Sequence, residues 1–233
     1  KNKKMRKNKI VSIIALVLML TMVFVGCANE TPSGDKPAEF DLNKDITVVA
    51  RDAASGTRGA FHEIMKIIVK ENDTEVDKLV VGSLEFDGTD KVITAVEGDK
   101  YGIGYISLGS VSDRIKALAV NGAEPTVENV KSGDYSVSRP FLLVTKGNES
   151  DLVKDFLKFT ESTEGQKITD DIKFIGYVDS PVDYTASGMS GTIKVAGSTS
   201  VAPLMEKLQE AYQALNPDIT FETQAQGSSQ GIK

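Results

Sequence analysis

The stretch DITVVARDAASGTRGAF, residues 45–61, contains a strand, a turn and the start of a helix. Its first six residues are a short β-branched run, which predicts a buried strand. Ser55-Gly56-Thr57 follows, and the apolar side chains at positions 61, 64, 65 and 68 have the spacing of one helical face. A strand that passes through small residues into a helix predicts an α/β fold, with Arg51 at the end of the strand.

The rest of the chain repeats this alternation, which favours largely parallel sheets. Hydrophobic runs predict strands at 101–109, 140–145, 191–197 and 219–226. Helical spacing predicts helices at 150–160, 163–172 and 201–215, and a short helix capped by Thr89 and running to Val96. The acidic runs at 71–77 and 161–171 are interpreted as solvated helix faces. Residues 179–190 lack periodicity and are interpreted as a linker.

The N-terminus has the pattern of an export signal. Residues 1–26 hold six cations and no acid, and a basic stretch precedes an apolar run. Cys27, the only cysteine, follows Gly26 where a lipoprotein signal would place its acylated residue. We expect a lipoprotein signal peptide at 1–26 and a flexible tether at 27–44. The alternative is an uncleaved membrane anchor, and both place the remainder outside the cytoplasm, held at the cell membrane.

The charge of the chain limits its partners. Subtracting the six N-terminal cations from the net charge of −6 leaves −12 for residues 27–233. Such an acidic body argues against nucleic-acid binding, which needs clustered Lys and Arg. It also repels anions at long range, so an anion site here must depend on local donors.

Three turns share one design, in which a strand ends, hydroxyl residues follow and a helix begins. They are Arg51 to Thr57, Gly197 to Ser200, and Gly227 to Gly231. Free backbone N–H groups and hydroxyl donors at such turns can hold an anion, and an arginine adds a permanent countercharge. Each turn alone is equally explained by helix capping. The three together favour a site for a tetrahedral oxyanion, whose burial requires many converging donors.

Catalysis has little support in the sequence. His62, the only histidine, falls within the predicted helix, where a surface position or a satisfied side chain is the simpler interpretation. No G-x-S-x-G motif and no cluster of metal-ligand residues is present, so neither a metal nor a cofactor is expected. A secreted phosphatase or serine hydrolase using Ser55 and His62 is the alternative, but seven residues separate the two along a helix.

Several segments together resemble the PstS family, the extracytoplasmic phosphate-binding proteins of phosphate ABC transporters. These are ITVVARDAASGTRGAF, YGIGYISLG, RPFLLV, the EGQKI stretch, VAGSTSVAPLMEKLQEAY and QGSSQGIK. The resemblance implies a two-lobed fold like type II periplasmic binding proteins, with lobes at 45–138 and 139–233. It also implies a binding protein without enzymatic activity, which passes inorganic phosphate to membrane permease subunits.

The resemblance also implies a phosphate site. Its members would be Thr199 and Ser200, then Ser228, and then Arg51, Ser55, Gly56 and Thr57. Ala53 stands where the family often has an acid. Other oxyanions, such as sulfate or molybdate, remain alternatives.

The segments follow an order that differs from most of the family, which suggests a circular permutation. We expect the chain to be truncated, with the family's acidic site residue lying beyond Lys233.

Overall fold

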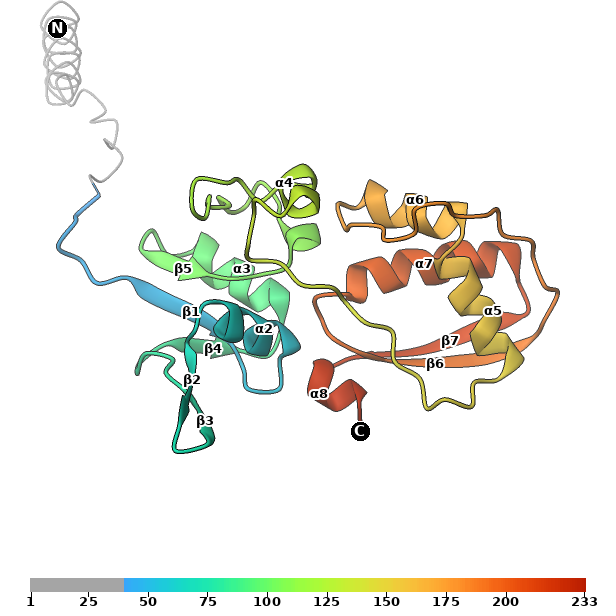
Figure 1. Ribbon diagram of the computed structural model, residues 1–233, viewed down its shortest axis with the longest axis horizontal. Helices are drawn as coiled ribbons and strands as arrows, with labels where there is room; N and C mark the ends of the chain where they lie inside the picture. Colours follow the sequence, from blue (N-terminus) through green and yellow to red (C-terminus); the bar gives the residue numbers. More distant parts are fainter. Residues whose placement is uncertain (1–39) are drawn as a thin grey trace, which may run out of the picture. The chain divides into compact units, whose positions relative to one another are not determined.

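The computed structural model describes residues 40–233, so the predictions for the signal peptide and Cys27 lie outside the described residues. The chain divides into two units, Lys1–Lys44 and Asp45–Lys233, and the second contains all the described helices and strands. Within the described part, no helix combines the length and apolar character needed to span a membrane. The elements, in chain order (Figure 1), are β1 (Thr47–Arg51), α2 (Gly56–Ile64), β2 (Ile68–Glu71), β3 (Thr74–Asp77), β4 (Leu84–Phe86), α3 (Thr89–Glu97), β5 (Gly102–Gly104), the 3₁₀ turn η1 (Leu108–Ser110), α4 (Val127–Ser132), α5 (Asp151–Thr160), α6 (Thr163–Asp171), β6 (Gly191–Gly197), α7 (Ala202–Leu215), β7 (Ile219–Ala225) and α8 (Ser228–Gly231).

The first sheet has the strand order β4-β1-β5, and both pairings are parallel. β1 is the central strand, and Val49 and Ala50 on it are buried. Helix α3 packs on this sheet and buries Val92 and Ile93. Because parallel strands end at one edge, Arg51 at the end of β1 lies opposite Phe86 at the end of β4.

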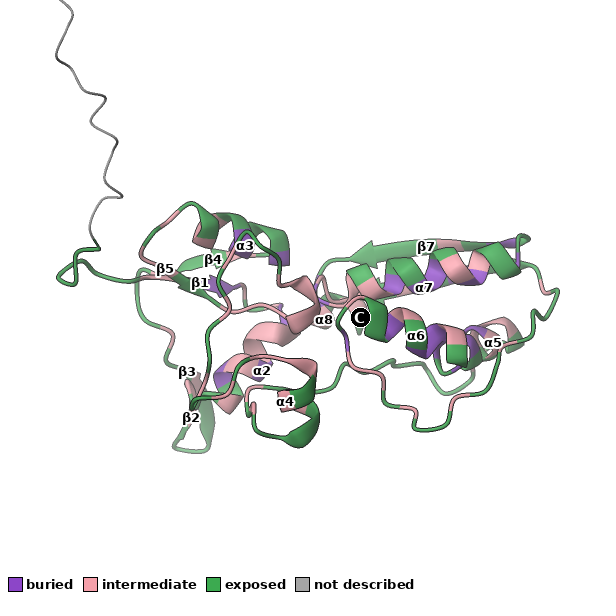
Figure 2. Ribbon diagram, turned by 90° about the horizontal axis from the view of Figure 1, so that it is seen from above, coloured by how far each residue is buried: buried purple, intermediate pink, exposed green. Residues whose placement is uncertain are grey.

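The second sheet consists of β6 and β7, which pair in parallel over seven residues each. Helices α5 and α7 cover one face of it (Figure 1) and enclose an aromatic core. Phe156, Phe159 and Tyr212 are at the centre of that core, with ring centroids 5.1–6.5 Å apart. Buried and exposed residues alternate along α7 (Figure 2), as the helical spacing of its apolar residues predicts.

The parallel α/β architecture and most of the predicted helices are confirmed. Serine caps set the start of α5 and α6, where the hydroxyls of Ser150 and Ser162 accept bonds from Val153 N–H and Gly165 N–H. Residues 179–190 contain no helix or strand. β6 has the bounds that the sequence predicts.

The prediction of one helical face from 61 to 68 is wrong beyond Ile64. α2 ends there, Lys66 has a positive φ of 56°, and Ile68 begins β2. The interpretation of residues 71–77 as a helix face is also wrong, because β2 and β3 form an antiparallel hairpin. Asn72 and Asp73 make its two-residue turn with φ values of 49° and 63°, as type I′ hairpin turns require.

Two predicted strands also differ from the structure. The strand at 140–145 is absent, because none of the described strands pairs with this segment, and its Leu142 and Val144 are 78% and 73% exposed. The strand at 101–109 is reduced to β5, after which the chain turns into η1. Thr89 does not cap α3, since Gly88 holds the cap position without a side-chain bond. The Thr89 side chain is instead buried at the site described next.

Candidate functional site

Arg51 is a buried cation held by neutral acceptors. Its side chain is 1% exposed and donates to three oxygens: Nε to Phe86 O at 3.2 Å, Nη2 to Asp87 O at 3.1 Å and Nη1 to Thr89 Oγ1 at 3.4 Å. Among residues 40–233 no carboxylate forms an ion pair with it. Ala53 occupies the position where the family often has an acidic residue, and an alanine cannot pair with the arginine. A guanidinium has five N–H groups, so these bonds leave one N–H on each Nη for a ligand.

Burial lowers the pKa of Arg51, and the nearby Asp52, Tyr105 and Asp87 offset this only in part. A guanidinium nevertheless stays protonated in proteins. A buried positive charge without a counterion is costly by several kcal/mol. The site therefore favours an anion.

The first two hydroxyl turns meet at this arginine. The Thr57 and Ser200 hydroxyls are 2.6 Å apart, although 143 positions separate the two residues. Thr89 Oγ1 lies 3.4 Å from both Thr199 Oγ1 and Ser200 Oγ. Ser200 is fully buried. Four hydroxyls from β6–α7, α2 and α3 thus form one cluster with the Arg51 guanidinium.

The third turn lies against the first. Ser229 N–H donates to Ala54 O at 3.3 Å, and a Cβ placed on Gly56 would come within 2.8 Å of Ser228 Cβ. Only a glycine at position 56 lets Ser228 approach this closely. The same Cβ would lie 3.2 Å from the guanidinium of Arg139, which makes no hydrogen bond or ion pair in the described part of the chain.

The structure brings Arg51, Thr57, Thr199 and Ser200 into one cluster through Thr89 and places Ser228 against Gly56, while Ser55 caps a helix. Its hydroxyl accepts a bond from Arg58 N–H at 3.3 Å, which leaves its own proton available to a ligand. The sequence reasoning missed Thr89, which it assigned to capping, and it did not single out Arg139. The signal for Arg139 was available in the RPFLLV segment, where an arginine precedes a proline at the start of an apolar run.

His62 is a buried side chain, and both of its ring nitrogens have polar partners. This agrees with one of the two interpretations that the sequence allowed, a buried histidine with its hydrogen bonds made. It is 0% exposed, and its two ring nitrogens contact Asp77 and the Tyr105 hydroxyl. Neither nitrogen is left to act as a base on Ser55, which disfavours a hydrolase. No group of three or more potential metal ligands occurs among residues 40–233.

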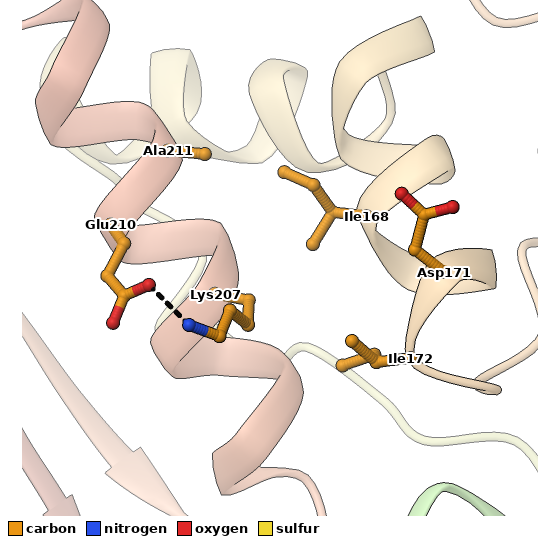
Figure 3. A pocket seen from close by; sticks show the side chains of 6 residues that line it. All are labelled: Ile168, Asp171, Ile172, Lys207, Glu210 and Ala211. Atoms are coloured by element: carbon orange, nitrogen blue, oxygen red, sulfur yellow. Dashed lines mark hydrogen bonds and ion pairs between the residues drawn. The ribbon is translucent and has the colours of Figure 1, made fainter.

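One groove of the described residues lies apart from Arg51. It lies between α6 and α7, has a volume of about 390 Å³ and is lined in part by Ile168, Ile172 and Ala211 (Figure 3). Lys207, its only cation, pairs with Glu210 at 2.7 Å. This groove contains no unpaired positive charge, in contrast to the surroundings of Arg51.

Comparison with known proteins agrees with this geometry. The model of the PBP superfamily domain matches residues 36–164 and 183–233. Phosphate-binding protein PstS 2 of Streptococcus pneumoniae is 38% identical over 222 residues, 92% of this chain and 75% of the relative. The chain belongs to the PstS family. PstS 2 of Streptococcus agalactiae, also 38% identical, aligns with 98% of this chain and 76% of its own length. Since one alignment spans nearly the whole chain, these PstS relatives share its order of segments.

Two solved structures resemble this PstS family member. A phosphate-binding protein of a phosphate ABC transporter from Streptococcus pneumoniae has a TM-score of 0.66 and 42% identity, covering 80% of this chain and 73% of that one. A putative phosphate ABC transporter substrate-binding protein with bound phosphate, from Clostridium perfringens, has a TM-score of 0.51 and 38% identity. That match covers 57% of this chain and 52% of the other.

Proposed function

We propose that this protein captures inorganic phosphate and delivers it to an ABC transporter, without performing chemistry on it. The observation that carries the proposal is Arg51, a buried cation with two spare N–H groups and no carboxylate partner among the described residues. The relatives are named as phosphate-binding proteins, and one similar structure contains phosphate. They are transport receptors rather than enzymes.

In this proposal, arginine side chains supply positive charge and hydroxyl side chains supply further hydrogen-bond donors. Arg51 would supply a bidentate pair of N–H groups to two phosphate oxygens. The hydroxyls of Ser55, Thr57, Thr199, Ser200 and Ser228 would donate to the oxygens, with Gly56 allowing close approach. Thr89 links Arg51 to the hydroxyl cluster, and Arg139 would add a second cation beside Gly56. The backbone N–H groups at the start of α2 favour the same anion.

We further propose that residues 45–138 and 139–233 act as two lobes that close on phosphate, with residues 179–190 as a linker within the second lobe. The hydroxyl contact between Thr57 and Ser200 supports this, because it connects the first helix of one segment to the turn before α7.

Attachment to the membrane would come from lipidation of Cys27 after removal of residues 1–26. Cys27→Ser should then abolish labelling of the chain by a fatty-acid analogue, and labelling that persists would contradict the anchor.

Titration calorimetry at neutral pH tests the binding proposal. We expect saturable binding of phosphate, with sulfate competing far less well. Failure of the folded chain to bind either anion would overturn the phosphate function. Binding of sulfate in preference to phosphate would change the substrate but keep the site.

A further inference from the structure

A second buried polar network contacts the backbone of Arg51 and contains none of the side chains proposed to bind phosphate. His62 is fully buried on α2, and its Nδ1 lies 3.0 Å from both carboxylate oxygens of Asp77 at the end of β3. Its Nε2 lies 3.2 Å from the hydroxyl of Tyr105, just after β5. The network therefore joins α2, β3 and the residue after β5, and none of its three side chains is among the proposed phosphate contacts.

Both backbone groups of Arg51 are bound by this network. The N–H of Arg51 donates to the Tyr105 hydroxyl at 3.1 Å, and its carbonyl accepts from Arg58 Nη1 at 2.9 Å. Arg58 in turn donates from Nε and Nη2 to Asp77 Oδ2, at 3.0 and 2.9 Å. Asp77 thus supports two arms, one through His62 and Tyr105 and one through Arg58, that end on the backbone N–H and the backbone carbonyl of Arg51.

The direction of each hydrogen bond follows from the groups at the two ends. A peptide N–H can only donate and an ionised carboxylate can only accept. The Tyr105 hydroxyl, which accepts from Arg51, is left to donate its own proton to His62 Nε2. His62 therefore carries its proton on Nδ1 and donates it to Asp77, so the chain of bonds requires the neutral ring.

Packing holds Tyr105 in this position. Its ring stacks on Phe61, with centroids 4.2 Å apart and planes 13° apart, and meets the His62 ring edge-on at 5.6 Å. Burial of the tyrosine raises the pKa of its hydroxyl, so the hydroxyl keeps its proton. The hydroxyl that receives the Arg51 N–H is thus fixed by an aromatic contact on α2 and by His62.

We propose that Tyr105 and His62 are positioning residues for Arg51, and that a second proton on His62 disrupts this positioning and weakens phosphate binding. The inference rests on the proposed phosphate function. A proton on Nε2 would take away the acceptor of the Tyr105 hydroxyl and leave that buried hydroxyl proton without a partner in the network. The charged groups that face His62 or its partner are Asp77 on β3, Arg58 on α2 and Glu85 on β4, which pairs with Arg58.

Tyr105→Phe tests the positioning, because it removes only the hydroxyl and keeps the stack on Phe61. We expect the phosphate Kd to rise about tenfold and the Arg51 amide to exchange its hydrogen faster, since it loses its acceptor. Tyr177→Phe is the control, because it removes a hydroxyl bonded to Glu161 far from this network along the chain. Unchanged affinity together with unchanged exchange at Arg51 would overturn the positioning role.

His62→Gln tests the proton sensitivity, because the glutamine carbonyl can accept from Tyr105 and does not titrate. We expect its Kd to be about threefold above that of the natural protein near pH 7.5. As the pH falls to 5.5, the Kd of the natural protein should rise more steeply than that of the variant. Phosphate protonates equally in both titrations, so the ratio of the two Kd values isolates the protein. A ratio that does not change with pH would overturn the proton sensitivity.

Two further readings keep the test decisive. If His62→Gln fails to fold, the Arg51 amide shift of the natural protein, followed by NMR against pH, replaces it, and a flat profile contradicts the inference. If the natural protein binds no phosphate, the proposed function fails. Amide exchange at Arg51 in Tyr105→Phe still reports on the network in that case.

Discussion

The β1–α2 and β6–α7 junctions have the same sequence design and use their serines differently. Ser55 occupies the N-cap of α2 and accepts a bond from Arg58 N–H, so this serine stabilises its own helix. At the second junction the N-cap is Val201, which makes no side-chain cap bond. Ser200 is fully buried there and contacts Thr57 of the first junction. A serine before a helix can therefore cap that helix while it also faces a site, or contact the site alone, and only the tertiary structure separates the two cases.

The largest expected effect comes from the charge at the first junction. Arg51→Ala should weaken phosphate binding at least about 100-fold, because two charge-assisted hydrogen bonds and the countercharge are lost. The thermal midpoint without phosphate should change little, because an unpaired buried charge is also removed. Arg114→Ala, which removes an exposed arginine paired with Glu97, is the control and should bind normally. Calorimetry and thermal melts measure both, and equal affinities would remove Arg51 from the site.

The next largest effect is expected at Gly56, where the third turn lies close to the first. Gly56→Ala should weaken phosphate binding about tenfold, because the added Cβ collides with Ser228 and displaces its hydroxyl. Gly59→Ala on the same helix meets no atom within 4 Å and should stabilise the protein by about 0.5–1 kcal/mol. Denaturant unfolding and calorimetry separate the two variants. Normal binding by Gly56→Ala would show that Ser228 takes no part.

The contrast between the two serines gives a smaller effect. Ser55→Ala should lower the free energy of unfolding by about 1 kcal/mol, because α2 loses its cap. Ser200→Ala should leave that free energy within about 0.5 kcal/mol and weaken phosphate binding about fivefold, because the site loses one donor. If Ser200→Ala destabilises the protein as much as Ser55→Ala does, the distinction between the junctions is wrong.

The smallest expected effect concerns the stability of the fold at acid pH, to which Asp77 contributes. Desolvation raises the pKa of the Asp77 carboxyl, but bonds from Arg58, Leu79 N–H and His62 outweigh it, so the pKa lies below its ordinary value. Asp77 therefore stabilises the fold above that ordinary value, near 4, and this contribution is lost as the pH falls through the lowered pKa. Asp77→Asn should flatten the fall in stability below about pH 4, as measured by urea unfolding. An unchanged slope would contradict the shift.

The sequence predicted the elements whose stability is local or periodic. The helical spacing of apolar residues predicted α5 and α7, and a bounded apolar run predicted β6. The prediction from sequence failed where the helical spacing of apolar residues continued past the end of a helix. Ile68 has the spacing of the α2 apolar face but lies in β2. The hairpin turn at Asn72 and Asp73 carried a readable signal that was attributed to solvated acids.

The site was predictable in its members but not in its contacts. Resemblance placed Arg51, Thr57 and Ser200 in one site, and the structure brings them together. The carbonyl groups of Phe86 and Asp87 that hold Arg51 could not be found, because any residue supplies a backbone carbonyl. Thr89 was assigned to capping because no local pattern distinguishes a cap from a buried contact with a distant arginine.

The most direct test of the convergence of the three turns on one anion is a crystal structure with arsenate, a tetrahedral analogue whose arsenic is located by anomalous scattering. We expect one strong anomalous peak within hydrogen-bonding reach of the Arg51 guanidinium and of the Thr57, Ser200 and Ser228 hydroxyls, and phosphate should displace it. A peak located away from Arg51, or none from crystals soaked at saturating arsenate, would contradict the account.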